Sequence, residues 1–495
     1  MHSGATDYYG EPYRPQFHFT YKKGWLSDIN GLVYYDGEYH FFSQHCPASA
    51  QCDYPSTHWG HAVSGDMIQW RELTPAIAPD ETNGPAFSGS SVVDWNNTSG
   101  LQTGEAPPIV AFYTGARYML PQPRPGVICI AYSNDRGRSW TKYDGNPVLE
   151  AITELNRDPK VFRHEPTARW IMAITLSCAD NWLSSGVGDY RFALLSSPDL
   201  IHWTEVSRLD MPRGLDCPDM FELPVDGDPA HTRWVFWAGD GTHAVGTFDG
   251  KEFRREGDIH LPLFPYYENG GFGYAAQTFS DMPSSDGRLI QIAWLQNGSY
   301  PDMPFSQQAL FPCELTLRTT PEGVRLCREP IREIELIRDA DLRWRHEPLT
   351  HTGRAIGGPA GELLDICAEI EIGDLSKVTL EVRGIPIVYE ARARTLRCMD
   401  AAVELIPVAN RISLRVLVDR ASIEVFAGGG RVSMALGCHP RVNDRAVFLS
   451  GQGGEGRLVD LAAHRLRSIW SDRSPGDQHG PRPPADPLAQ SLGDR

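Results

Sequence analysis

The sequence contains no apolar run of about 18 residues, which is the length that a membrane-spanning helix needs. Its first ten residues have neither a basic start nor the hydrophobic stretch of a signal peptide. Both absences argue against a membrane protein. As written, the chain is expected to be cytoplasmic, or secreted if a leader has been removed.

Positive charge is scarce relative to negative charge. The chain has 46 Lys and Arg residues against 63 Asp and Glu residues, which gives a formal net charge of −17. Nucleic acids and anionic membrane surfaces attract proteins through Lys and Arg, so both are unfavourable partners for this chain. A neutral substrate such as a sugar fits this charge better.

Cysteines are present but lack the paired spacing of a metal site. The ten cysteines are scattered over 495 residues, which indicates neither a zinc site nor a dense disulfide framework. Cys46 and Cys52 lie close enough in sequence to pair across a loop, and this possibility stays open.

Long amphipathic helical patterns are also missing. Instead, short alternating or apolar runs lie between turn signals, as in residues 31–43, where Asp36 and Gly37 join two expected strands. The chain is therefore predicted to be all-β. Its length and an apolar content of 41% are sufficient for two domains, each with its own core.

A weak internal repeat divides the first part of the chain. Residues 64–70 (SGDMIQW) match residues 197–203 (SPDLIHW), and residues 133–140 (SNDRGRSW) are a looser copy. Each copy follows an apolar, strand-like segment, and the unit recurs about every 65 residues. All-β units that repeat in this way are typical of a β-propeller.

Two further units, at residues 234–253 and 274–317, bring the count to five. We therefore predict a five-bladed propeller over residues 16–335. The composition changes after Leu336, and residues 340–470 are predicted to form a second all-β domain, a β-sandwich. Its expected strands are short and alternating: Leu363–Ile372, Lys377–Val382, Ile412–Val418, Ser422–Phe426 and Val447–Leu449. The Pro- and Asp-rich residues 471–495 are predicted to be disordered.

Three aspartates stand in unusual local sequences. Asp28 lies in WLSDING between Trp25 and an expected Asn-Gly turn, Asp158 lies in NRDP, and Asp216 lies in GLDCPD. The first strands of successive blades line a propeller's axis, so these carboxylates can converge there. Two neighbouring carboxylates suit glycoside hydrolysis. The alternative is that each is a turn residue that caps backbone N–H groups.

With these motifs the sequence resembles glycoside hydrolase family 32, which comprises invertases, levanases, inulinases and related fructosyltransferases. Further segments carry the resemblance: Trp59–His61 with Ser64 and Asp66, Phe87–Ser90, Phe112–Gly115, Tyr274–Thr278, Ile292–Trp294, Pro304–Gln308 with Glu314–Leu315, and Leu417–Phe426. The resemblance implies a five-bladed propeller with an axial fructofuranosyl pocket, a β-sandwich, and no metal or organic cofactor.

The resemblance also assigns roles to residues. It implies that Asp28 is the nucleophile, that Asp158 holds fructose hydroxyls, and that Asp216 is the acid/base. The neighbouring Arg157 is expected to keep Asp158 ionised. The residues expected to bind the substrate are Asn30, Gln44, Tyr54, Phe87, Ser88, Arg157 and Trp294. For Trp59 and His61, core packing and sugar contact both remain open.

Two departures from the family pattern affect the function. Ser27 and Ile29 stand where the family usually has Asn and Pro, and Ser at the first place recurs among members that transfer fructose. Asp216 stands where the family has Glu, and its carboxyl is drawn back by roughly 1.5 Å. Asp219 and Glu222 are disfavoured as replacement acids because both are expected on the following strand.

The leading hypothesis is a retaining, exo-acting hydrolase that releases fructose from a fructan such as levan or inulin, or from sucrose. The alternatives are a fructosyltransferase, suggested by Ser27, and a fructan-binding protein with weak catalysis, suggested by Asp216. The partner is then a small or polymeric fructoside.

Overall fold

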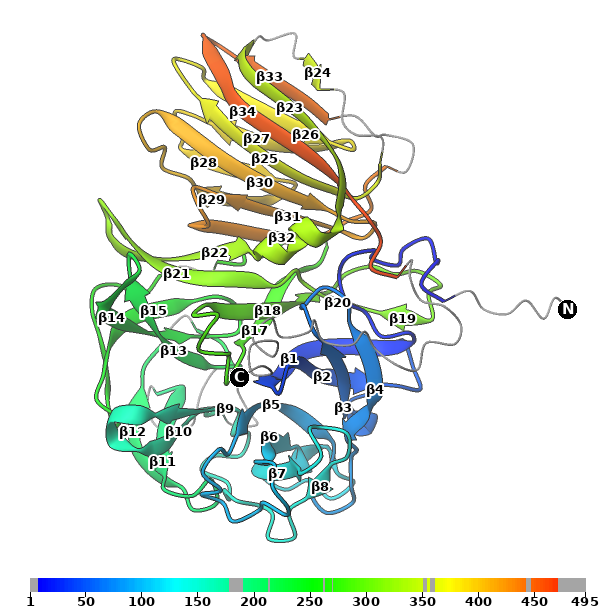
Figure 1. The fold of residues 1–495 in the computed structure, drawn as a ribbon, viewed down its shortest axis with the longest axis vertical. Helices are drawn as coiled ribbons and strands as arrows, with labels where there is room; N and C mark the ends of the chain where they lie inside the picture. The colour runs from blue at the N-terminus through cyan, green and yellow to red at the C-terminus, as the bar shows by residue number, and fades with distance from the viewer. Residues whose placement is uncertain are drawn as a thin grey trace, which may run out of the picture.

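The computed structural model describes residues 8–177, 190–211, 214–260, 263–268, 270–349, 354–356, 361–441 and 447–470. These residues form 34 strands and four short 3-10 helices: η1 (Tyr54–Ser56), η2 (Arg117–Met119), η3 (Glu165–Thr167) and η4 (Arg332–Ile337). Figure 1 shows a ring of sheets below and two stacked sheets above, which confirms the all-β prediction of a propeller followed by a sandwich. Among the described residues, no helix is long and apolar enough to cross a membrane. The predicted disordered tail lies outside them.

The propeller has five antiparallel blades. Blade 1 contains β1 (Gly24–Tyr35), β2 (Glu38–Cys46), β3 (His58–Ser64) and β4 (Arg71–Ile77). Blade 2 contains β5 (Ala86–Val93), β6 (Ile109–Gly115), β7 (Val127–Ser133) and β8 (Thr141–Lys142), and blade 3 contains β9 (Arg157–His164), β10 (Arg169–Thr175), β11 (Phe192–Ser197) and β12 (Thr204–Leu209). Blade 4 contains β13 (Asp219–Val225), β14 (Asp228–Trp237), β15 (His243–Phe248) and β16 (Phe253–Arg255). Blade 5 contains β17 (Phe272–Thr278), β18 (Leu289–Gln296), β21 (Cys313–Thr320) and β22 (Gly323–Pro330), with β20 (Gln308–Ala309) paired to β18.

A short parallel pairing closes the ring between blade 5 and blade 1. β19 (Phe305–Ser306) aligns Phe305 with Gly24 and Ser306 with Trp25 on β1. The backbone N–H of Gly24 also donates to the Pro304 carbonyl at 2.9 Å. Because closure leaves β1 paired on both sides, the strand that carries Asp28 is held firmly at the propeller axis.

The internal repeat forms the turn between the third and fourth strands of blades 1, 2 and 3. In blade 1, the carboxylate of Asp66 accepts hydrogen bonds from the backbone N–H groups of Ile68 (2.9 Å) and Gln69 (2.8 Å). Trp70 donates from its indole to the Met67 carbonyl, at 3.1 Å. Asp135 and Asp199 make the equivalent backbone contacts in blades 2 and 3. The repeated Ser, Asp and Trp residues are therefore turn residues that define the blades.

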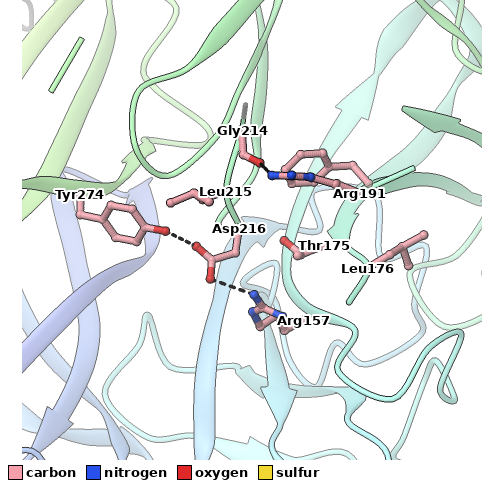
Figure 2. Close-up of a pocket in the computed structure, with 9 residues that line it drawn as sticks. Arg157, Thr175, Leu176, Arg191, Gly214, Leu215, Asp216 and Tyr274 are labelled. Atoms are coloured by element: carbon pink, nitrogen blue, oxygen red, sulfur yellow. Dashed lines mark hydrogen bonds and ion pairs between the residues drawn. The ribbon is translucent and has the colours of Figure 1, made fainter. Parts of the chain in front are cut away.

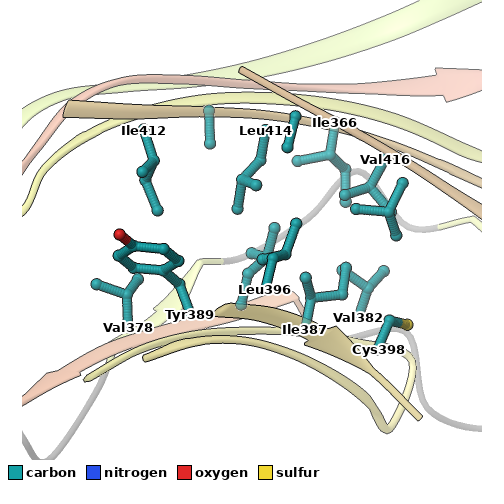
Figure 3. Packing of buried hydrophobic residues seen from close by; sticks show 14 of the residues in the cluster. Ile366, Val378, Val382, Ile387, Tyr389, Leu396, Cys398, Ile412, Leu414 and Val416 are labelled. Carbon is teal, nitrogen blue, oxygen red and sulfur yellow. The ribbon is translucent and has the colours of Figure 1, made fainter. Parts of the chain in front are cut away.

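The sandwich is built from two six-stranded sheets. One contains β23 (Arg338–Leu349), β34 (Gly456–Leu466), β25 (Leu364–Glu371), β30 (Arg411–Val418), β31 (Ser422–Ala427) and β32 (Val432–Gly437). The other contains β24 (Arg354–Ile356), β33 (Val447–Gln452), β26 (Lys377–Val382), β27 (Ile385–Glu390), β28 (Thr395–Cys398) and β29 (Ala401–Glu404). Alternate residues of both sheets point inward, so that Ile412 and Leu414 face Tyr389 and Leu396 (Figure 3). This is the packing that a period-2 apolar pattern produces.

A buried polar cluster fastens the two domains together. His18, in the segment before β1, lies 2.8 Å from the carboxylate of Asp419 and 2.7 Å from that of Glu424. Asp419 also accepts hydrogen bonds from the backbone N–H groups of Gln16 and Phe17. Burial alone would lower the pKa of His18, but the two carboxylates raise it to about 9. His18 is therefore a buried cation at neutral pH.

The nine described cysteines are all free. Cys46 is buried and its thiol donates to the Asp53 carbonyl at 3.3 Å, whereas Cys52 is exposed. The disulfide that the sequence left open between these two residues is therefore absent.

Candidate active site

The three aspartates come from three different blades. Asp28 lies on β1, Asp158 is the second residue of β9, and Asp216 lies just before β13. These are the first strands of blades 1, 3 and 4, so the propeller brings together residues that are far apart in sequence.

The sequence prediction that WLSDING contains a turn at Asn-Gly was wrong. Residues 25–31 lie within the continuous strand β1, whose pairing with β2 shifts register between Leu26 and Ile29 and again between Asn30 and Val33. Gly31 has a φ of +55°, and a Cβ there would lie within 3 Å of Ser91, Trp59 and Phe42. The WLSDING segment therefore belongs to an irregular, tightly packed strand. Its register shifts are β-bulges, which redirect side chains near active sites.

Asp28 is held by polar side chains from two neighbouring strands. Its Oδ2 accepts hydrogen bonds from the hydroxyl of Ser88 at 2.5 Å and from the amide of Gln44 at 3.1 Å. Gln44 also donates to Ser88 at 2.6 Å. Burial raises the pKa of Asp28 to about 6, and the charge of Asp216 adds to this, while the Ser88 hydrogen bond acts in the opposite direction. At neutral pH Asp28 is an oriented carboxylate.

Asp158 is nearly completely buried and has a φ of +60°, a strained conformation for a residue with a side chain. Its Oδ2 accepts a hydrogen bond from the backbone N–H of Cys217 at 3.2 Å and lies 3.3 Å from Nε of Arg157. Burial raises the pKa of Asp158 and the charge of Asp216 adds to this, whereas the Arg157 guanidinium acts in the opposite direction. Arg157 lowers the pKa of Asp158, in the direction expected from the sequence, but burial is the larger effect and the net shift is upward.

Both oxygens of Asp216 have partners, as the dashed lines in Figure 2 show. The hydroxyl of Tyr274 donates to Oδ1 at 2.5 Å, and Nη2 of Arg157 donates to Oδ2 at 3.0 Å. Arg157 is buried, and its other amino group donates to the Leu155 carbonyl and to Ser177. Arg157 therefore links Asp158 to Asp216 and fixes the distance between them.

Cys217 lies among the three carboxylates. Its thiol is 3.7 Å from Oδ2 of Asp28. A carboxylate oxygen of Asp158, a carboxylate oxygen of Asp216 and the sulfur of Cys217 lie within 4.8 Å of one another. Among the described residues, this is the single group of three side chains close enough together to hold a metal ion. The Arg157 guanidinium already pairs with both Asp158 and Asp216, and its positive charge disfavours a metal cation there. Burial and the three carboxylates raise the pKa of Cys217, so its thiol stays protonated.

Four aromatic rings form a connected group that includes Trp25, on the same strand as Asp28. Trp25 contacts Tyr54 and Trp294 edge-on, with centroid distances of 6.1 and 6.3 Å. Tyr54 lies 5.9 Å from Phe87 and is 49% exposed, so it stands at the solvent side of this group. The indole N–H of Trp294 is buried and has no hydrogen-bond partner among the described residues. These rings present apolar faces and one available donor.

Other candidate residues are structural. Asn30 is completely buried, and the orientation of its amide that satisfies both neighbours lets it donate to the Ile29 carbonyl and accept from the Gln44 N–H, both at 3.1 Å. Trp59 is also buried and donates to the Phe87 carbonyl at 2.8 Å, while the ring of His61 stacks on Phe42. Asn30 therefore braces β1 against β2, and Trp59 and His61 belong to the core.

The two replacement acids weighed from the sequence are occupied elsewhere. Asp219 is buried on β13, pairs with Lys160 at 3.2 Å and accepts from the Thr278 N–H at 2.6 Å. Glu222 is exposed on the same strand and accepts from Thr232. Sequence reasoning did not identify Tyr274 as a partner of Asp216, although the segment Tyr274–Thr278 was among the motifs; its contact with blade 4 depends on tertiary structure.

Comparison with known proteins agrees with this arrangement. The family model described as Glycosyl hydrolases family 32 N-terminal domain matches residues 18–330, and that of the family's C-terminal domain matches residues 334–465. The chain is 36% identical to a levanase of Bacillus subtilis over 94% of this chain and 72% of the levanase. It is 27% identical to an extracellular exo-inulinase of Aspergillus niger over 94% of this chain and 96% of that protein.

Solved structures share the fold over nearly the whole chain. The exo-inulinase from Aspergillus awamori aligns with a TM-score of 0.80 at 24% identity, covering 93% of this chain and all of that one. A β-fructofuranosidase from Schwanniomyces occidentalis, complexed with fructosyl-erythritol, aligns with a TM-score of 0.78 at 25% identity and covers 92% of this chain and 98% of that one.

Proposed function

Because this chain belongs to glycoside hydrolase family 32, we propose that it is a retaining, exo-acting glycosidase that releases fructose from β-D-fructofuranosides. The observation that carries the proposal is the meeting of Asp28, Asp158 and Asp216 at one end of the propeller axis, each held by specific partners. Supporting it, the relatives named above are a levanase and an exo-inulinase.

In the first step, an oxygen of Asp28 attacks the anomeric carbon of the fructosyl unit and forms an ester bond. The hydrogen bonds from Ser88 and Gln44 to Oδ2 keep that carboxylate in one orientation. Orienting a nucleophile in advance removes part of the entropic barrier to attack. As the glycosidic bond breaks, Asp216 gives its proton to the departing oxygen.

In the second step, Asp216 takes a proton from water, and the hydroxide formed replaces Asp28 on the anomeric carbon. Asp158 does not take part in bond making under this proposal. Its buried carboxyl, fixed by Arg157 and the Cys217 N–H, hydrogen-bonds fructose hydroxyls. Such bonds favour the transition state when they strengthen as the ring becomes cationic.

The aromatic residues define where the sugar rests. Phe87 and Trp294 offer apolar faces to the ring, and Tyr54 stands at the exposed side. The N–H of Trp294, which has no hydrogen-bond partner among the described residues, offers a donor for a sugar oxygen. These contacts suit one terminal fructofuranosyl unit.

The test is release of free fructose from levan, inulin and sucrose, measured on the folded protein. Asp28→Ala and Asp158→Ala should each abolish release without unfolding the chain. Absence of release from all three substrates overturns the proposal, and calorimetric binding of fructan without product then favours a binding protein. The anomer first released, followed by NMR, distinguishes retention from inversion.

Transfer of fructose to a sugar acceptor is the second candidate, because Ser27 precedes the nucleophile. Ser27 is buried, and its hydroxyl donates to Oε1 of Gln44 at 3.4 Å. Any effect of Ser27 therefore acts through Gln44, which holds Asp28. Oligosaccharide products at high sucrose concentration would support transfer, whereas equal amounts of glucose and fructose at every concentration exclude it.

A further inference from the structure

Two residues of the candidate active site stand at β-bulges. In blade 2, the pairing of β5 with β6 shifts register at Ser88. In blade 3, the pairing of β9 with β10 shifts register at Asp158 and Pro159, which lie between the paired residues Arg157 and Lys160. A bulge directs a side chain out of the regular alternation of a strand, but it also removes backbone groups from the hydrogen-bonded ladder. Those groups need other partners when they are buried.

Thr114 contacts both bulges. It lies on β6 and is completely buried, in the segment Phe112–Gly115 that carried part of the family resemblance. Its hydroxyl accepts a hydrogen bond from the backbone N–H of Asp158 at 2.9 Å and donates one to the carbonyl of Ser88, also at 2.9 Å. A hydroxyl has a single proton to donate, so these two contacts fix its orientation.

The backbone conformation of Asp158 depends on this contact. Its φ of +60° is unfavourable for a residue with a side chain, and such a conformation persists only where the surrounding structure holds it. The residue is buried, and the Thr114 hydroxyl is the acceptor for its N–H. Loss of that hydroxyl would leave a buried N–H without this partner, which favours a shift of the backbone and of the carboxyl that it carries.

The same hydroxyl acts on the support of the nucleophile. The side chain of Ser88 donates to Oδ2 of Asp28 at 2.5 Å, while the carbonyl of Ser88 is held by Thr114. A shift of the Ser88 backbone therefore changes the hydrogen bond that orients Asp28. One hydroxyl in blade 2 is thus linked to a carboxylate in blade 1 and to another in blade 3.

We propose that Thr114 is a positioning residue of this active site, whose hydroxyl holds the bulges of Ser88 and Asp158 in place relative to each other. The carboxyl groups of Asp28 and Asp158 then meet the same fructosyl unit. Thr114 itself does not touch the substrate and acts through its two neighbours. The inference rests on the proposed fructosidase function and deepens it.

The experiment removes the hydroxyl and measures steady-state kinetics on the substrate that the parent cleaves fastest among sucrose, levan and inulin. Thr114→Val keeps the shape of the side chain but can neither donate nor accept, whereas Thr114→Ser keeps the hydroxyl. We expect Thr114→Val to lower kcat about 10- to 100-fold, because a small displacement of reacting groups costs this much. KM should change by less than about threefold, and Thr114→Ser should keep kcat within about threefold of the parent.

Ser90→Ala is the matched control. Ser90 is also completely buried, on β5, and its hydroxyl accepts a hydrogen bond from the backbone N–H of Val161 on β9 at 2.9 Å. It joins the same two blades, but neither of these residues belongs to the candidate site. Thr114→Val and Ser90→Ala should both lower the melting temperature, because each leaves a buried N–H without its acceptor. Ser90→Ala should keep kcat within about twofold of the parent.

A double-mutant cycle tests the link to the nucleophile. Ser88→Ala removes the hydroxyl that bonds Asp28 but keeps the carbonyl that Thr114 bonds. If Thr114 acts partly through Ser88, the two substitutions are not independent. The loss of kcat in the double variant should then be at least about threefold smaller than the product of the two single losses.

A kcat for Thr114→Val within about twofold of the parent would overturn the proposal. An equal loss in Ser90→Ala would overturn it because the effect would be a general loosening of blades 2 and 3, and an equal loss in Thr114→Ser because the hydroxyl would not matter. Single losses that multiply in the cycle would show that Thr114 does not act through Ser88, which also contradicts the proposal.

If Thr114→Val fails to fold, Thr114→Cys takes its place, since a thiol is a weaker hydrogen-bonding group of similar size. An intermediate loss of kcat is then expected, and a kcat equal to that of the parent overturns the proposal. Failure of the parent protein to cleave any of the three substrates would instead count against the proposed function.

Discussion

The hydroxyl of Tyr274 donates a 2.5 Å hydrogen bond to Oδ1 of Asp216, while Arg157 holds Oδ2 of the same carboxylate at 3.0 Å. Tyr274 lies on blade 5 and Arg157 on blade 3, so Asp216 is anchored from both sides. These two contacts, and not the length of the side chain alone, decide where the carboxyl stands.

We predict that Tyr274→Phe lowers kcat by about 10- to 100-fold, because a carboxyl with one anchor rotates away from the departing oxygen. KM should change much less, since the fructosyl unit is held elsewhere. Steady-state kinetics on sucrose test this. A raised KM with unchanged kcat would mean that Tyr274 binds substrate instead of positioning Asp216.

Asp216→Glu addresses the departure from the family pattern. Since both oxygens of Asp216 already have partners, an added methylene displaces the carboxyl from Arg157 and Tyr274. We predict a loss of about 10-fold in kcat/KM for the Glu variant and a larger loss for Asp216→Asn, which has no proton to give. A gain of activity in Asp216→Glu would show instead that the short side chain limits turnover.

The acid limb of the pH profile should report Asp28. Burial raises the pKa of Asp28 to about 6, and the nucleophile acts only when ionised. The rate should therefore fall about tenfold per pH unit below pH 6. In Ser88→Ala the hydrogen bond that lowers this pKa is lost, so the limb should move to higher pH. A limb that stays in place, measured as kcat/KM from pH 4 to 8, would contradict the role of Ser88.

The junction between the two domains, where His18 meets Asp419 and Glu424, should become less stable as the pH rises. The carboxylates of Asp419 and Glu424 raise the pKa of His18 to about 9 against the desolvation of burial. A raised His pKa gives stability that is complete below the unfolded pKa near 6.5 and is lost as pH rises through 9. The raised pKa of His18 contributes about 3 kcal/mol to the free energy of unfolding. Urea unfolding at pH 6, 7.5 and 9 tests this.

His18→Gln is the matched variant for that experiment. It should be less stable than the parent at pH 6, and the difference between the two proteins should shrink toward pH 9. A difference that stays constant over this range would show that His18 contributes by packing alone and not by its charge.

Much of the architecture could be predicted from local patterns. The Ser, Asp and Trp residues at 64–70 and 197–203 predicted the blades because each turn closes on itself: Asp66 and Asp199 bond backbone groups within three residues. Such a turn depends only on residues that are consecutive in the sequence, so the sequence alone predicts it. The alternating strands of the sandwich, such as Lys377–Val382, were predictable for the same reason.

The site was predictable in its composition but not in its geometry. Asp28, Asp158 and Asp216 were found from their motifs, and the structure places them together. The Asn-Gly pair read as a turn lies inside β1, because packing of Gly31 against Trp59 and Phe42 overrides the local turn preference.

Motifs and the period of apolar residues were enough to predict the family, the two-domain all-β fold and the three aspartates. The folded chain was needed to show that Tyr274 and Arg157 share Asp216 and that burial shifts the pKa of Asp158 more than Arg157 does. Each of these depends on contacts between blades and on how much water is excluded. Contacts between blades and the exclusion of water cannot be predicted from any single segment of the sequence.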